Sequence, residues 1–166
     1  MLKKFVRGIF NNSNMPKILF ICHGNICRSP MAEYIFNKMV ADAGLSDQFV
    51  IDSAATSREE IGNDIYPPAK VCLKEHGIPF SKHHAKQITK EMIKEFDYVI
   101  AMEQYNINNM IRQFGESEKY SLLLDYTDTP VGISDPWYSG EFETTYNEIV
   151  TGCQGLLIHL KLVTNK

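Results

Sequence analysis

The sequence has little of what a nucleic-acid-binding or membrane-spanning protein needs. Its 166 residues carry a formal net charge of −3. Both signs are spread along the chain, so no basic stripe predicts a nucleic-acid surface. No apolar run is long enough to cross a membrane, and no cleavable signal pattern is present. Repeats, low-complexity tracts and linkers are also missing, so we expect one domain with a sizeable core and no nucleic-acid partner.

Cysteine is scarce and unevenly spread. Cys22 and Cys27 are close together, whereas Cys72 and Cys153 lie far downstream on helical patterns that predict core positions. This spacing gives no disulfide framework, which favours a reducing compartment, and we expect a cytoplasmic protein. Cys22 and Cys27 have no matching second pair, and His23 would crowd a tetrahedral site, so we expect neither zinc nor another cofactor.

The first fourteen residues have a pattern of their own. Apolar residues recur at helical spacing opposite three basic ones, so a short basic amphipathic helix touching a membrane surface is one interpretation. The apolar residues are Leu2, Phe5, Val6, Ile9 and Phe10, and the basic ones are Lys3, Lys4 and Arg7. Because so short a helix is marginal alone, we favour a poorly ordered extension at 1–14 ahead of a domain at 15–166.

Strand-like and helix-like segments alternate through the rest of the chain. Short apolar runs predict strands at 17–22, 49–53, 98–102 and 120–124. Periodic segments with Gly, Pro or Thr at their ends predict helices at 29–43, 67–76, 89–96, 103–114 and 141–163. This order predicts a single α/β domain with a mostly parallel four-stranded sheet and helices on both faces. Its site is expected at the carboxyl ends of the strands.

One loop at such a strand end has the residues of an oxyanion site. In ILFICHGNICRSP, Cys22 and Arg28 stand six positions apart, where a strand gives way to a helix. A thiolate can attack phosphorus, and a guanidinium can bind two phosphate oxygens. Gly24 lets the backbone approach a ligand and Asn25 tolerates left-handed geometry, so successive amides can form an anion nest. The helix start and Arg28 should keep Cys22 ionised, and Ser29 can donate to the sulfur.

The context of this pair argues against chance. A Cys followed six residues later by an Arg is a weak signal alone, and the alternative is an inert buried thiol. Here the pair follows a strand, opens a helix and encloses Gly-Asn. The segment therefore predicts a cysteine-dependent phosphatase.

Several segments resemble the low-molecular-weight protein tyrosine phosphatases, from about Lys17 to about Leu162. CHGNICRSPMAE is similar to the signature of that family, and other family-like segments follow in family order: IDSAATS, EIGN, HGIPFSKHHAKQITKE, FDYVIAM, SDPWY and FET. The resemblance implies a phosphatase that hydrolyses phosphotyrosine and small aryl phosphates through a phosphocysteine intermediate, without metal or cofactor. We expect a flavodoxin-like topology with the strands in the order second, first, third, fourth.

A carboxylic acid is needed to protonate the leaving tyrosyl oxygen. Similarity to the Asp-Pro pair of the family identifies Asp135, beside Pro136, as this acid. Asp128 in TDTP is the rival, and a turn residue is the better interpretation of it.

The resemblance also implies residues that support the loop. Asn25, Ser53 and His83 are expected to hydrogen-bond and hold it in shape, while His84 is expected to be a solvated neighbour. In family members with a second cysteine, that thiol forms a reversible disulfide with the nucleophile. For Cys27 this pairing and a small buried residue remain equal alternatives.

Substrate contacts are expected from the loop and from the cleft rim. The residues expected to bind substrate are His23, Gly24, Asn25, Ile26, Cys27, Ser29, Glu59, Trp137 and Tyr138. His23, Glu59 and Trp137 depart from the common family residues, as do Glu103 and Lys86 in the outer network. A phosphotyrosine ring should stack on Trp137 and Tyr138, and Glu59 should favour basic peptide flanks.

Three alternatives to phosphotyrosine hydrolysis remain. Thiol-dependent arsenate reductases share the fold and loop, but need a resolving cysteine pair that this chain lacks. A phosphoarginine phosphatase is the second, against which Ile26 argues, because members with that preference tend to carry a small hydroxyl residue there. A phosphotyrosine-binding module without turnover is the third. Phosphotyrosine proteins or peptides and inorganic phosphate are the expected partners, and a monomer is favoured.

Overall fold

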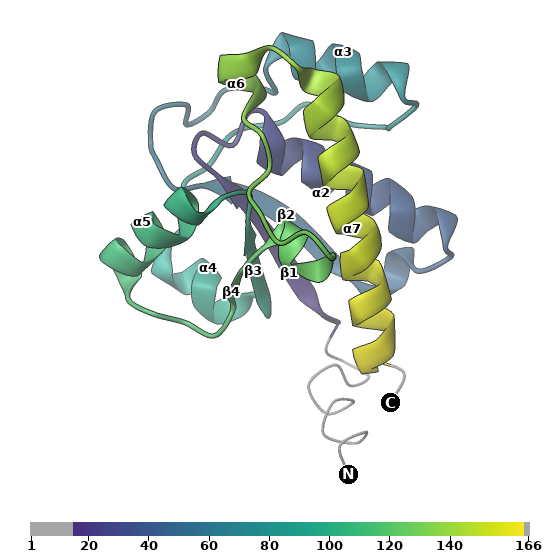
Figure 1. Ribbon diagram of the computed structural model, residues 1–166. Helices are drawn as coiled ribbons and strands as arrows, with labels where there is room; N and C mark the ends of the chain where they lie inside the picture. The colour runs from purple at the N-terminus through teal and green to yellow at the C-terminus, as the bar shows by residue number, and fades with distance from the viewer. Residues whose placement is uncertain (1–14, 165–166) are drawn as a thin grey trace.

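A four-stranded parallel sheet lies at the centre of the computed structural model, which describes residues 15–164 (Figure 1). The strands are β1 (Lys17–Cys22), β2 (Val50–Ala55), β3 (Tyr98–Ala101) and β4 (Tyr120–Leu122). Their order is β2-β1-β3-β4, with every neighbouring pair parallel. This confirms the expected fold class and strand order. The predicted extension at 1–14 lies outside the described residues.

Helices cover both faces of this sheet. One face carries α2 (Arg28–Asp42), α3 (Pro67–Glu75) and the long α7 (Phe142–Thr164), and α4 (Lys90–Glu95) and α5 (Gln104–Phe114) lie on the other (Figure 1). The short elements are η1 (Ser46–Gln48), η2 (Leu123–Tyr126) and α6 (Pro136–Ser139).

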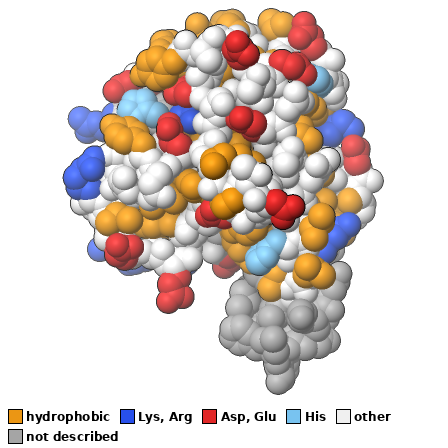
Figure 2. Space-filling view, viewed as in Figure 1, with side chains coloured by type: hydrophobic (Ala, Val, Ile, Leu, Met, Phe, Trp, Pro, Cys, Tyr) orange, Lys and Arg blue, Asp and Glu red, His pale blue; other side chains and the backbone are white. Residues whose placement is uncertain are grey.

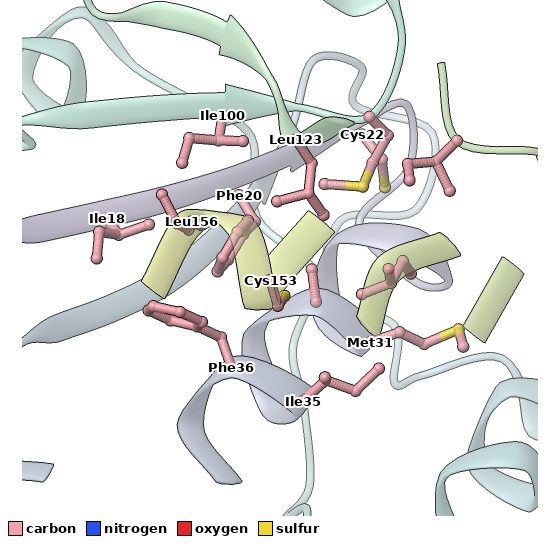
Figure 3. Close-up of a cluster of buried hydrophobic side chains, with 14 of the residues drawn as sticks. Ile18, Phe20, Cys22, Met31, Ile35, Phe36, Ile100, Leu123, Cys153 and Leu156 are labelled. Carbon is pink, nitrogen blue, oxygen red and sulfur yellow. The ribbon is translucent and has the colours of Figure 1, made fainter. Parts of the chain in front are cut away.

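Side chains of β1 alternate between the two faces and so join two separate cores. Ile18, Phe20 and Cys22 belong to the cluster with α2 and α7, whereas Leu19 and Ile21 belong to the cluster with α4 and α5. Figure 3 shows Ile18 and Phe20 pointing toward α2 and α7, and the Phe20 and Phe36 rings meet edge-on at 5.9 Å. Because both faces of β1 are buried, its register is fixed, and Cys22 is held at its carboxyl end.

Strand β1 is also the point where the strand order reverses. Its neighbours are β2 on one side and β3 on the other. In open parallel sheets the crevice outside the carboxyl ends at such a point is where ligands bind. The fold therefore brings the loop after Cys22 to the location expected for a site.

Two short elements differ from the sequence prediction. The strand predicted at 120–124 ends at Leu122, because the next four residues form the turn η2. The helix α6 was not predicted, although its signals are in the sequence: Asp135 caps it, Pro136 opens it, and Gly140 ends it with φ 74°.

Helix length and the distribution of surface charge were two concerns of the sequence analysis. Among residues 15–164, no helix is long and apolar enough to cross a membrane. On the face drawn in Figure 2, acidic, basic and apolar side chains are interspersed without a continuous basic band.

The close packing of α7 on η2 can be tested with Gly155→Ala. In an ordinary helix interior, alanine is more stable than glycine by up to about 1 kcal/mol. Here the added Cβ would lie 2.9 Å from the Tyr126 carbonyl carbon and closer still to its oxygen. We expect the steric overlap with Tyr126 to outweigh the gain in helix propensity. The free energy of unfolding, measured by urea denaturation, should fall by about 2 kcal/mol.

The control for this variant is Gln154→Ala, an exposed position on the same helix. It should change the free energy of unfolding by less than about 0.5 kcal/mol. A Gly155→Ala protein as stable as the parent would contradict the close approach of α7 to Tyr126.

Candidate active site

The loop after β1 wraps its backbone around the Cys22 sulfur. Asn25 has φ 63°, and among the described non-glycine residues it alone has positive φ. Its amide N–H donates to Cys22 Sγ at 3.3 Å. Asn tolerates this left-handed conformation better than most residues, which explains its place in the loop. The turn aims an amide dipole at the sulfur, where negative charge would be stabilised.

A hydroxyl reaches the same sulfur from the first turn of α2. Ser29 Oγ lies 3.0 Å from Cys22 Sγ and accepts a hydrogen bond from Asn25 Nδ2 at 2.8 Å. Because its lone pairs face that amide, the Ser29 hydroxyl hydrogen is available to the sulfur. Asn25 Nδ2 also donates to Ser53 Oγ at 2.9 Å, which links the loop to β2.

His83 and Lys86 donate hydrogen bonds to the two oxygens of Asn25. The imidazole Nε2 of His83 donates to the Asn25 carbonyl at 2.7 Å, and the Lys86 amide donates to Asn25 Oδ1 at 3.1 Å. Burial lowers the pKa of His83, which favours the neutral ring with its proton on Nε2. Asn25 is fully buried. All its polar groups thus have partners, and its unusual backbone conformation is fixed from outside the loop. His84, by contrast, is exposed.

Sequence reasoning missed a carboxyl behind this network. Glu33, one turn after Ser29 on α2, accepts from Ser53 Oγ at 2.6 Å. Burial raises its pKa from 4.5 to about 7, partly opposed by the hydrogen bond from Ser53. Its spacing of four from Ser29 is a helical signal, but only the fold brings β2 against it.

The Arg28 guanidinium is buried and fixed by three acceptors. Its Nη1 donates to the Ile133 carbonyl at 2.8 Å, and Nη2 donates to Glu103 Oε2 at 2.7 Å and Asp135 Oδ2 at 3.2 Å. Burial alone would lower its pKa, but negative charge on Cys22 and on the two carboxylates raises it. Glu103, at a position where the sequence resemblance leads one to expect aspartate, thus contacts the guanidinium.

Nucleophile, clamp and acid candidates all line one cavity of about 480 Å³. Its walls are Cys22, His23, Gly24, Ile26, Cys27, Arg28, Glu59, Glu60, Glu103, Tyr105, Asp135, Trp137 and Tyr138. Asn25, Ser29, Ser53 and His83 are buried and do not line this cavity. The rival acid Asp128 is exposed and outside the cavity. Glu60 and Tyr105 were not anticipated.

Aromatic and charged side chains form the cavity mouth. Trp137 is half exposed and packs on Tyr66 with ring centroids 4.8 Å apart. Tyr138 is 85% exposed and is the more adjustable of the two. On the opposite rim, His23 Nε2 pairs with Glu59 Oε1 at 3.2 Å. His23 and Glu59, which both depart from the common family residues, therefore contact each other.

Cys27 is a free, buried thiol beside the nucleophile candidate. Burial raises its pKa well above the ordinary value, with a further contribution from negative charge on Cys22. It therefore keeps its proton near neutral pH.

Comparisons with known proteins agree on one family. A family model described as low molecular weight phosphotyrosine protein phosphatase matches residues 17–166. The human low molecular weight phosphotyrosine protein phosphatase is 42% identical over 147 residues, covering 84% of this chain and 92% of its own length. The crystal structure of YfkJ from Bacillus subtilis matches with a TM-score of 0.84 at 37% identity, covering 89% of this chain and 96% of that one. The drosophila arginine phosphatase DARP matches with a TM-score of 0.78 at 31% identity, covering 87% of this chain and 98% of its own.

These similarities extend over the whole described fold. The matched residues include every strand and helix, the loop from Cys22 to Arg28, and the turn at Asp135. They also confirm the resemblance drawn from the sequence motifs. With a match of this length, the chain belongs to the low molecular weight phosphotyrosine protein phosphatase family.

Proposed function

We propose that this protein hydrolyses phosphotyrosine in proteins or peptides, and small aryl phosphates, with Cys22 as the nucleophile. The proposal rests on one observation above all. A thiol, a buried guanidinium and a carboxyl group, from Cys22, Arg28 and Asp135, line a single cavity at the switch in strand order. Nucleophile, anion clamp and general acid are the three groups that this reaction needs.

In the first step, Cys22 Sγ attacks phosphorus in line with the leaving tyrosyl oxygen. The S–P bond forms as the P–O bond breaks, and Asp135 gives its proton to that oxygen. Arg28 and the loop amides bind the equatorial oxygens of the transferring group and stabilise their negative charge. An oxyanion in this position competes with Asp135 for Arg28 Nη2, which frees the acid to turn toward the leaving group.

In the second step, water releases phosphate from the phosphocysteine. Asp135, now a carboxylate, takes a proton from the water as its oxygen attacks phosphorus and the P–S bond breaks. The departing sulfur accepts hydrogen bonds from the Ser29 hydroxyl and the Asn25 amide. These two donors stabilise the thiolate as a leaving group, so no metal or cofactor is required for either step.

The shape and charge of the mouth support an aryl substrate. Ile26 lines the cavity and is nearly buried, so it narrows the walls with apolar surface. Trp137 and Tyr138 offer aromatic faces on which a tyrosyl ring can stack. Glu59 and Glu60 on the rim favour peptides with basic residues beside the phosphotyrosine.

Phosphoarginine is the second candidate substrate. Its support is the similarity to DARP, whose name describes an arginine phosphatase. Hydrolysis rates on matched phosphotyrosine, phosphoserine and phosphoarginine peptides will show which substrate is preferred. Vanadate serves as inhibitor and EDTA as the control for metal dependence. We expect phosphotyrosine to be preferred, vanadate to inhibit and EDTA to have no effect; preference for phosphoarginine would select the alternative.

The family match from residue 17 onward supports two further assignments. We assign catalysis to the domain at 15–166 and regard 1–14 as an extension to it. Because Cys22 must stay reduced to react, a reducing compartment such as the cytoplasm suits the activity.

Cys22→Ser tests the nucleophile. The hydroxyl is far less ionised than a thiol, so we expect kcat on phosphotyrosine peptide to fall by about 10⁴-fold or more with the fold unchanged by circular dichroism. Cys27→Ser is the matched control and should retain most activity, because its buried thiol keeps its proton. Equal loss in both variants would contradict the assignment of Cys22.

Asp135→Asn tests the general acid without removing the cap of α6, because Asn also caps helices well. We expect kcat on phosphotyrosine to fall by about 100-fold or more, and much less on para-nitrophenyl phosphate, whose leaving group needs no proton. Asp128→Asn is the control and should change neither rate. Equal loss on both substrates would argue against acid catalysis by Asp135.

Glu33→Gln tests the partly buried carboxyl behind the loop. Because its pKa in the folded protein is raised from 4.5 to about 7, the unfolded chain gives up this proton first as pH rises. The free energy of unfolding should therefore fall between about pH 4.5 and pH 7, by at most about 3 kcal/mol from this group. Gln keeps the acceptor for Ser53 but does not titrate, so stability should decline less in the variant across this window.

The matched control for that experiment is Glu91→Gln, at an exposed position on α4. Its dependence of stability on pH should follow that of the parent protein. If Glu33→Gln also follows the parent, Glu33 does not hold a raised pKa in the folded state.

A further inference from the structure

A second cavity lies between α3 and the beginning of α7, apart from the catalytic one. Its volume is about 470 Å³, and it is lined by Pro67, Pro68, Val71, Cys72, Glu75, Phe142 and Glu143. None of these residues lines the first cavity. The proposed function leaves this cavity and its buried thiol unused.

Three side chains of different chemistry meet beside this cavity. Cys72 lies on α3 and His76 directly follows that helix at a spacing of four, which brings both to one face. Glu143 comes from the first turn of α7. The cysteine sulfur, a ring nitrogen and a carboxylate oxygen all lie within 4.8 Å of one another.

These atoms are a ligand set that Zn²⁺ prefers. Zinc binds Cys sulfur at about 2.3 Å and His nitrogen or carboxylate oxygen at about 2.0–2.2 Å, usually with four ligands. The ligand atoms of a tetrahedral site then lie roughly 3.3–3.8 Å apart. The separations in this cluster, from 2.9 Å between His76 Nε2 and Glu143 Oε1 up to 4.8 Å, require only small side-chain rotations. We propose that Cys72, His76 and Glu143 bind one zinc ion, with water from the open cavity as the fourth ligand.

The surroundings orient His76 and keep Cys72 close to the beginning of α7. The His76 ring stacks on Tyr146, with centroids 3.7 Å apart and planes within 10°, and its Nε2 faces Glu143. Cys72 is nearly buried, and its Sγ lies 3.7 Å from the Phe142 carbonyl oxygen. Zinc displaces the thiol proton of Cys72 to water as the Zn–S bond forms, and the carboxylate of Glu143 offsets part of the charge of the ion.

The electrostatics of this end of the molecule favour a cation. Glu75 and Glu143 both line the cavity and are exposed, so two carboxylates face the opening. Acidic side chains are also prominent on the surface over α3 and the beginning of α7 (Figure 2). A divalent ion is therefore attracted before it meets the thiol.

Occupancy of this site would cross-link α3 to α7. Phe142, next to Glu143, also packs on Tyr66, and Tyr66 packs on Trp137 at the mouth of the first cavity. Zinc at the site therefore stabilises the fold, including the packing of Tyr66 on Trp137, without contacting the reacting atoms.

Metal titration of full-length Cys22→Ser protein tests the site, because this background removes the catalytic thiol as a competing ligand. Anaerobic Co²⁺ should give a thiolate-to-cobalt charge-transfer band and the ligand-field bands of a tetrahedral ion, saturating at one ion per chain. Zn²⁺ should displace the cobalt and raise the melting temperature. Adding Cys72→Ser should abolish the charge-transfer band, and adding His76→Gln or Glu143→Gln should weaken zinc affinity by about 100-fold or more.

Matched controls separate this site from other thiols and histidines. His84→Gln and Glu141→Gln alter exposed residues outside the cluster and should leave affinity unchanged, as should Cys27→Ser within the catalytic loop. Absence of the charge-transfer band, or its survival in the Cys72→Ser variant, would overturn the proposal. Because both readouts measure metal binding and not activity, neither result depends on whether the protein hydrolyses phosphotyrosine.

Discussion

The left-handed turn at Asn25 is the constraint on which the site depends. It points an amide at the Cys22 sulfur, and a φ of 63° is costly for most side chains. The turn persists because Ser53 from β2 and His83 from the loop before α4 bind both ends of the Asn25 residue. Parallel pairing of β1 with β2 brings Ser53 to this place, so the sheet register and the loop geometry stabilise each other.

Burial of Arg28 imposes a second constraint. A buried guanidinium needs acceptors for its donors, and a carbonyl and two carboxylates from the chain beyond β3 supply them. These acceptors fix the plane of the guanidinium without using its full set of donors. The clamp is therefore aligned before an oxyanion arrives, which lowers the entropy lost on binding. Glu103 can replace a shorter carboxylate in this role, because the hydrogen bond to Arg28 depends on where the carboxylate oxygen lies and not on where its Cα lies.

Local signals and motif similarity predicted most of this arrangement, and the remainder depends on tertiary contacts. The strand before Cys22 and the helix after it follow from apolar periodicity, and Asn25 follows from its own conformational tolerance. The contact of Glu33 with Ser53 and the pairing of His23 with Glu59 join segments that no sequence spacing connects. Cys72 is a buried core residue, as its helical pattern predicted. Its proximity to Glu143 arises from the packing of α3 against α7.

In the proposed mechanism, one carboxylate, that of Asp135, serves both steps. Its Oδ1 accepts from the Trp137 amide as the cap of α6, and its Oδ2 contacts Arg28. The cap ties Asp135 to the turn that carries Trp137, so an aromatic ring stacked on Trp137 brings its phosphoryl oxygen near the same carboxyl. We infer that substrate binding shifts Oδ2 from the guanidinium to the leaving oxygen by a side-chain rotation about a fixed cap. Because the cap stays in place, Asp135 can return as a base for the attacking water without rebuilding the loop.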